Sequence, residues 1–156
     1  MIKNIIAVSA IAVSAIASPA KAQDNGVRTL PSAHSHAATI EKFETVAKAA
    51  GMKIFARIDH AAAAKEAGMT MQPATVIIFG APKTGTPMMM KQATLAIDLP
   101  LKALVWQDSS GKTFPSYNSA SYVLGTIFGR HGLKPPEAAV KAQEEGLANL
   151  AAAATK

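Results

Sequence analysis

Apolar residues recur with the period of a helix between Ile40 and Ala50. A helix is predicted there, capped by Ser35 or His36 and ended by Gly51. Its apolar positions fall on one face: Ile40, Phe43, Val46, Ala47 and Ala50. Glu44 and Lys48 lie four residues apart and are expected to pair on the solvent side of this helix.

Strand-like patterns occupy five other stretches. They are residues 27–30, 53–59, 75–79, 101–107 and 113–117. The third stretch is uncharged and rich in β-branched residues, which is typical of a strand buried on both faces, so we expect it to be central. The last two flank a short segment rich in serine and glycine that suits a β-hairpin, so these strands should be antiparallel.

Shorter helices are predicted between and after these strands. Asp59 can cap a helix over residues 60–67, residues 80–87 read as a loop, and residues 88–94 as a short helix. Ser119 can cap another helix running toward Arg130. The pattern predicts a single compact α+β domain, with a mixed or antiparallel sheet of four to five strands covered by helices.

The two ends of the chain differ from this domain. Residues 1–22 combine Lys3, an uncharged apolar run and a small-residue cleavage site ending at Ala22, which predicts a signal peptide and a periplasmic or secreted protein. The run is too short for an uncleaved membrane anchor. No second apolar stretch approaches membrane length, so no membrane insertion is expected after cleavage. The domain is expected over residues 23–133. Residues 134–156 predict an appended, alanine-rich and partly frayed C-terminal helix.

Charge and composition limit the classes of partner and of chemistry that are expected. The whole chain carries a net charge of +6. Without the two lysines of the signal it keeps 14 basic and 10 acidic side chains, a net charge of +4. The basic residues form no run and aromatic residues are sparse, so no nucleic-acid partner is expected. The absence of cysteine excludes disulfides, thiolate metal sites and a cysteine nucleophile.

Four motifs in order carry a resemblance to a known family. They are FARIDH (55–60), PATVIIFGAPKTGTP (73–87), DLPLKALVW (98–106) and SYN (116–118). With them the chain resembles the bacterial family called domain of unknown function 302, over roughly residues 30–133. It departs from that family at Ala81, where asparagine is usual, and in residues 118–130, which are about one helical turn longer. The resemblance implies a compact α+β domain, often secreted, for which a homodimer is plausible and no activity is agreed.

The glycine-containing segment at residues 80–86 follows an apolar strand, as a phosphate-binding loop does. Thr86 stands where such a loop needs lysine, and Pro82 and Pro87 each remove a backbone N–H. The segment is interpreted as a plain tight loop, with an anion site as the alternative.

Asp59 and His60 end the second strand. Neighbours on a strand point to opposite sides, so the pair alone cannot form an acid–base dyad. Asp59 is interpreted as a helix cap. His60 is either a structural histidine or a titratable group of a site.

Histidine and methionine supply two weaker candidates. His34 and His36 could chelate a divalent ion but are interpreted as surface residues near a helix start, and no metal is predicted. The methionines between residues 69 and 90 could meet copper, but they are interpreted as packing residues or an oligomer contact.

Two function classes follow. The first is a non-catalytic module that binds a small ligand or a partner protein in one cleft, with no cofactor. The second is an enzyme of unknown reaction, with His60 as general acid or base and Lys83 or Arg57 holding an anionic substrate. No catalytic nucleophile is identified. The candidate ligand-binding residues are Arg57, Asp59, His60, Gly80, Lys83, Gly85, Thr86, Tyr117 and Asn118.

Overall fold

The fold is an antiparallel sheet of five strands with helices on one face and at its ends. The computed structural model describes residues 25–156, so the predicted signal peptide lies outside the described residues. The strand order is β1-β5-β4-β3-β2, which confirms the predicted α+β class. The strands are β1 (Val27–Thr29), β2 (Lys53–Asp59), β3 (Ala74–Gly80), β4 (Leu101–Gln107) and β5 (Thr113–Asn118).

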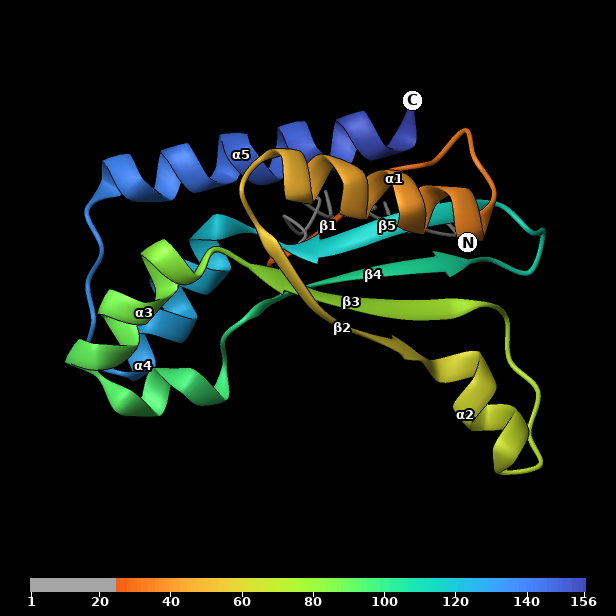
Figure 1. The fold of residues 1–156 in the computed structure, drawn as a ribbon, viewed down its shortest axis with the longest axis horizontal. Helices are drawn as coiled ribbons and strands as arrows, with labels where there is room; N and C mark the ends of the chain where they lie inside the picture. Colours follow the sequence, from red (N-terminus) through yellow and green to blue (C-terminus); the bar gives the residue numbers. More distant parts are fainter. Residues whose placement is uncertain (1–24) are drawn as a thin grey trace, which may run out of the picture.

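The helices fall into three groups. Helices α1 (His36–Ala49) and α5 (Glu137–Thr155) lie side by side over one face of the sheet, as Figure 1 shows. Helix α2 (His60–Glu66) extends from one end of the sheet on the side away from them (Figure 1). The other end carries α3 (Pro82–Lys91), the 3₁₀ helix η1 (Ala93–Ile97), the π-helix η2 (Ser121–Ile127) and α4 (Phe128–Arg130).

The predicted hairpin between β4 and β5 is confirmed. Its turn is held by the Asp108 carboxylate, which accepts hydrogen bonds from the backbone N–H groups of Ser110 and Lys112 at 2.9 Å each. Gly111 supplies the left-handed conformation that the turn requires, with φ of 82°.

Strand β3 is an interior strand, but the prediction that both its faces are buried is wrong. Ile77 and Phe79 are fully buried under the helices, whereas Val76 and Ile78 are only half-buried on the opposite face. The reason is that the helices cover one face of the sheet only, so alternate side chains of an apolar strand meet different surroundings.

Helix α1 forms much of the core, as predicted. The Ser35 hydroxyl caps it by accepting from the Ala38 N–H, and Phe43 packs edge-on against Phe79 at 5.1 Å between ring centres. The Glu44 carboxylate pairs with Lys48 as expected, at 3.7 Å, but it is buried rather than on the solvent side. The cause is Arg57 of strand β2, whose guanidinium lies against the Glu44 carboxylate and forms an ion pair with it.

Helix α5 is part of the core, and the expectation of a partly frayed tail is wrong. Leu147 and Leu150 are 4% and 3% exposed, and Ala151 and Ala154 are fully buried. Alanine lacks a large side chain, so α5 can approach α1 closely, and the buried residues of α5 belong to one apolar cluster with Phe43 of α1. The alanine-rich composition that resembled a loose tail is what permits this contact.

Helix α3 corrects the prediction of a loop over residues 80–87. The helix begins at Pro82, where the missing N–H of proline costs nothing because the first helical N–H groups have no partner within the helix. The segment from Ser119 to Arg130 is helical as expected, although most of it is a π-helix rather than an α-helix.

Candidate functional site

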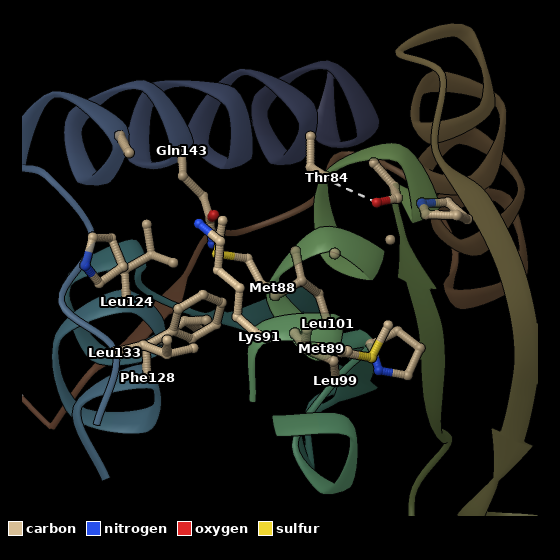
Figure 2. A pocket seen from close by; sticks show the side chains of 18 of the residues that line it. Thr84, Met88, Met89, Lys91, Leu99, Leu101, Leu124, Phe128, Leu133 and Gln143 are labelled. Atoms are coloured by element: carbon tan, nitrogen blue, oxygen red, sulfur yellow. Dashed lines mark hydrogen bonds between the residues drawn. The ribbon is translucent and has the colours of Figure 1, made fainter. Parts of the chain in front are cut away.

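A large cavity lies at the end of the sheet where β3 leads into α3. Its volume is about 660 Å³, within the usual range for small-molecule sites. In Figure 2, Leu124, Phe128 and Leu133 line one side, and Met89, Leu99 and Leu101 line the opposite side. The lining is therefore largely aliphatic, aromatic and thioether.

Glycine and proline residues shape the walls of this cavity. Gly80 and Gly85 face it without side chains, and a Cβ added at Gly80 would touch Pro100 at 3.4 Å. Pro135 and Pro136 carry the chain across the cavity before α5 begins at Glu137. Because proline cannot join the preceding helix, this connection stays extended and leaves the space beneath it open.

The π-helix η2 supplies part of the wall. Val123 and Leu124 are buried residues of η2 that border the cavity. π-Helical turns are rare and occur frequently at functional sites. The extra turn noted in this part of the sequence therefore lies directly at the cavity.

Four polar side chains line the cavity: Gln143, Lys91, Lys134 and Thr84, whose hydroxyl donates to the Ala81 carbonyl. The side-chain nitrogen of Gln143 is buried and has no hydrogen-bond partner within residues 25–156. Figure 2 shows this side chain extending from α5 into the cavity, with Lys91 nearby. Lys91 and Lys134 line the cavity and are exposed, and neither takes part in an ion pair among the described residues.

This arrangement fits a mainly apolar guest with one polar end. A buried N–H without a partner costs about 1–3 kcal/mol, and a guest oxygen that accepts from Gln143 would remove that cost. Two lysines beside the same space favour an anionic end over a cationic one.

The structure does not bring the predicted site residues into one cleft. Asp59 pairs with Thr75 and Lys53 with Gly80, so His60 lies at one end of β3 and Gly80 at the other. Thr75 and Gly80 are five positions apart along β3, so these two ends of the strand are about 17 Å apart.

Two of the three candidate residues at the end of β2, Asp59 and Arg57, make structural contacts. The Asp59 carboxylate accepts from the Ala62 N–H at 3.0 Å, which confirms it as the cap of α2. Arg57 binds Glu44, and this ion pair fastens the edge strand β2 to α1. His60 is exposed at the start of α2.

Of the four candidate residues in the 80–86 segment, two line the cavity and two do not. Gly80 and Gly85 line the cavity, together with Thr84 between them. Lys83 and Thr86 are exposed on α3 and are not part of the lining.

Tyr117 and Asn118 lie at a second, smaller cavity of about 230 Å³. Burial raises the pKa of the Tyr117 phenol above its ordinary value, and the nearby Glu144 carboxylate adds to the shift. Asp98 and Lys102 border the same space.

A cluster of polar side chains that the sequence did not indicate joins η1 to the end of α4. The Asp98 carboxylate binds the Arg130 guanidinium through two hydrogen bonds of 2.9 and 2.6 Å and the His131 ring at 2.6 Å. The other ring nitrogen of His131 lies 2.9 Å from the Thr94 hydroxyl. Hydrogen bonding from His131, followed by that from Arg130, lowers the pKa of Asp98.

This Thr94–His131–Asp98 chain resembles the hydroxyl–imidazole–carboxylate order of a nucleophilic triad. Arg130 already neutralises the carboxylate, and neither Thr94 nor His131 borders the two cavities described here. The cluster joins η1 to the end of α4, and the neighbouring Leu99 and Phe128 line the larger cavity. The adjacent Arg130 and His131 were the one available signal for it in the sequence.

His34 and His36, which were considered as metal ligands and interpreted as surface residues, each bind a backbone carbonyl distant in the sequence. The His34 ring binds the Lys156 carbonyl at 2.5 Å, and the His36 ring binds the Val105 carbonyl at 3.1 Å. Across residues 25–156, no three histidine, aspartate or glutamate side chains gather as a metal site.

The methionines separate into two sets. Met88 and Met89 are half-buried and line the larger cavity. Met69, Met71 and Met90 are exposed, with Met90 82% exposed.

Comparison with known proteins identifies a matching family and a similar solved structure. The profile of the family described as "Domain of unknown function DUF302" matches residues 28–154. The crystal structure of an uncharacterized conserved DUF302 protein from Bacillus stearothermophilus is similar with a TM-score of 0.65. It shares 17% sequence identity, over 84% of this chain and 96% of that one. At this identity the likeness concerns the fold alone.

Longer relatives also match. Proteins named fluoride-specific ion channel FluC 1 from Brucella suis and FluC 2 from Brucella melitensis are each 42% identical over 124 residues. The match covers 79% of this chain but only 47% and 44% of those proteins, so the chain spans about half of their length. No helix within residues 25–156 is long and apolar enough to cross a bilayer.

Proposed function

The chain belongs to the DUF302 family, and from this premise we propose that it is a non-catalytic binding module for a small, mainly apolar molecule with one anionic end. The observation that supports this most directly is the cavity of about 660 Å³, into which Gln143 directs a side-chain nitrogen that has no hydrogen-bond partner among residues 25–156. The shape and the apolar lining suit a flexible chain of a medium-length carboxylic acid.

Binding would draw on two sources of free energy. Moving one CH₂ group from water into the cavity is worth about 0.8 kcal/mol, or roughly fourfold in affinity. The carboxylate would accept from Gln143 and interact with Lys91 or Lys134 at the opening. Apolar burial then supplies most of the affinity, and the polar end fixes the orientation.

A series of fatty acids tests both sources. Octanoate and decanoate should bind the mature chain with dissociation constants that differ by about 15-fold, since decanoate buries two more CH₂ groups. Decanol should bind more weakly than decanoate, and Lys91→Ala should reduce this difference. Equal affinity along the series, measured by titration calorimetry, would contradict binding in an apolar cavity.

Two alanines of α5 provide a matched pair of variants. Ala142 lines the cavity, whereas Ala148 is exposed on the same helix outside it. Ala142→Phe should lower decanoate affinity at least tenfold by occupying the space, and Ala148→Phe should leave it unchanged. Equal effects of the two changes would place binding elsewhere.

The second part of the proposal concerns the localisation of the protein. The charged start, apolar run and small residues of positions 1–22 support export, so we assign the module to the periplasm or the exterior. There it would meet free amphipathic molecules rather than nucleotides.

The longer Brucella proteins favour a second candidate function. Because about half of each lies outside the match, we propose that a domain of this kind also serves as an accessory to a membrane protein. The test is whether this chain co-elutes with the separately expressed remainder of the Brucella suis protein in detergent. Independent elution would leave the ligand-binding proposal alone.

A further inference from the structure

The face of the sheet opposite α1 and α5 is uncovered, as Figure 1 shows. Alternation along the strands directs the side chains between the core positions toward this face. Its central residues are half-buried and apolar: Val76, Ile78, Leu104, Trp106 and Phe114. We call these residues, with Ala56 and Ile58 of β2, the open face.

The polar atoms of the open face are already satisfied. The Trp106 indole N–H donates to the Ser116 hydroxyl at 2.9 Å, and the Thr29 hydroxyl lies 2.8 Å from the same oxygen. Trp106 also stacks on Phe114 at 4.9 Å. Three lysines border this face at the ends of its strands: Lys102 of β4, Lys53 of β2, and Lys112, whose ammonium lies 5.6 Å from the centre of the Phe114 ring. A partner would therefore meet an apolar centre with a few positive charges at its margin, and the centre needs no new hydrogen bonds.

Helix α2 gives a second, independent observation. It has seven residues, none of them buried, and helices this short are not stable without packing. Exposed apolar side chains lie beside it, with Ile58 43%, Met69 62% and Met71 45% exposed. Within the protomer α2 contacts β3, but most of its residues and these apolar side chains stay exposed.

We propose that two copies of this chain associate through the open face and α2, with their sheets packed face to face about a twofold axis. Four full-length strands present a flat area of about 450 Å², from the strand spacing and rise. Helix α2 adds about 100 Å². The accessible area of a corrugated surface exceeds its projection, so the total approaches the roughly 800 Å² per partner of a standard interface.

A second copy fits this surface better than other partners. Two such faces are alike in shape and apolar at their centres, and sheets of this kind pack about 10 Å apart through interdigitated apolar side chains. Binding of an anionic membrane or nucleic acid typically uses a dense cluster of basic side chains, whereas Lys53, Lys102 and Lys112 are spread over the ends of this face and its centre is apolar. This association uses a surface other than the Gln143 cavity, so it goes beyond the proposed ligand binding.

Sedimentation of the mature chain over a range of concentrations tests the proposal. We expect a reversible dimer, and Leu104→Lys at the centre of the face should raise its dissociation constant at least 100-fold. Ile58→Lys, at an exposed position of the edge strand, should raise it at least tenfold and serves if Leu104→Lys fails to fold. Ala153→Lys adds the same charge at an exposed position of α5 and should leave dimerisation unchanged.

Trp106 identifies which surface is used, because it is the single tryptophan of the chain. Its emission should shift to the red, and quenching by iodide should increase, as dilution separates the dimer. A dimer in which Trp106 is as accessible as in the Ile58→Lys variant would place the interface elsewhere and overturn the proposal. A monomer at all concentrations would also overturn it, and a blue shift seen only with phospholipid vesicles would assign the face to a membrane.

Discussion

Replacement of Leu150 by alanine measures how firmly α5 is held in the core. The side chain is 3% exposed and belongs to the same apolar cluster as Phe43 of α1 and Phe79 of β3. Comparable buried leucine-to-alanine changes cost 2–5 kcal/mol, and the outer layer of a small domain can relax in part, so we expect a loss of about 3 kcal/mol. For a domain of this size that loss lowers Tm by about 10 °C.

The assay is urea unfolding followed by circular dichroism, with a thermal melt on the same samples. Asn149→Ala is the matched control, because Asn149 is exposed on the neighbouring position of α5 and its replacement should change the unfolding free energy by no more than about 0.5 kcal/mol. If Leu150→Ala loses less than about 1 kcal/mol, α5 is not docked and the cavity it covers would not exist in solution.

Three further outcomes follow from the structure and the sequence. Because hydrogen bonding from Arg57 holds the pKa of Glu44 below its ordinary 4.5, the stability due to this pair is complete above pH 4.5 and is lost as pH falls through the lower folded value. Glu44→Gln should therefore flatten the acid side of the stability curve, and an unchanged curve would refute this role. Gly26→Ala should destabilise more than Gly111→Ala, since both glycines have positive φ but only at Gly26 would the new Cβ lie 2.7 Å from a tyrosine side chain; equal losses in urea unfolding would contradict the contact. Intact mass of periplasmic protein should show Gln23 as the first residue, and a retained N-terminal methionine would refute signal cleavage.

Much of the fold could be predicted because local patterns determine it. Strand alternation, the Asp108 turn and the Ser35 cap are short-range features, and the hairpin and α1 appear where these features place them. The errors came from packing. Ala151 and Ala154 resemble a solvated tail in sequence, and only the proximity of α1 makes them core residues.

The candidate site was harder to predict, because it depends on which ends of the strands meet. His60 and Gly80 both follow strands, but antiparallel pairing places them at opposite ends of the sheet. Gln143 carried no signal, since a glutamine in a helix rich in alanine and glutamate looks like an ordinary surface residue. Gly80 and Gly85, which the sequence placed in a plain tight loop with an anion site as the alternative, line the larger cavity.

The methionine methyl groups allow the most direct test of ligand binding. With ¹³C-methyl methionine in the mature chain, decanoate should shift the NMR signals of Met88 and Met89, which line the cavity, in a saturable manner. The signals of Met69, Met71 and Met90 should remain in place, because these side chains are exposed outside it. Saturable shifts of the first pair alone would support a ligand in this cavity. No shift at Met88 and Met89, or equal shifts at all five, would contradict it.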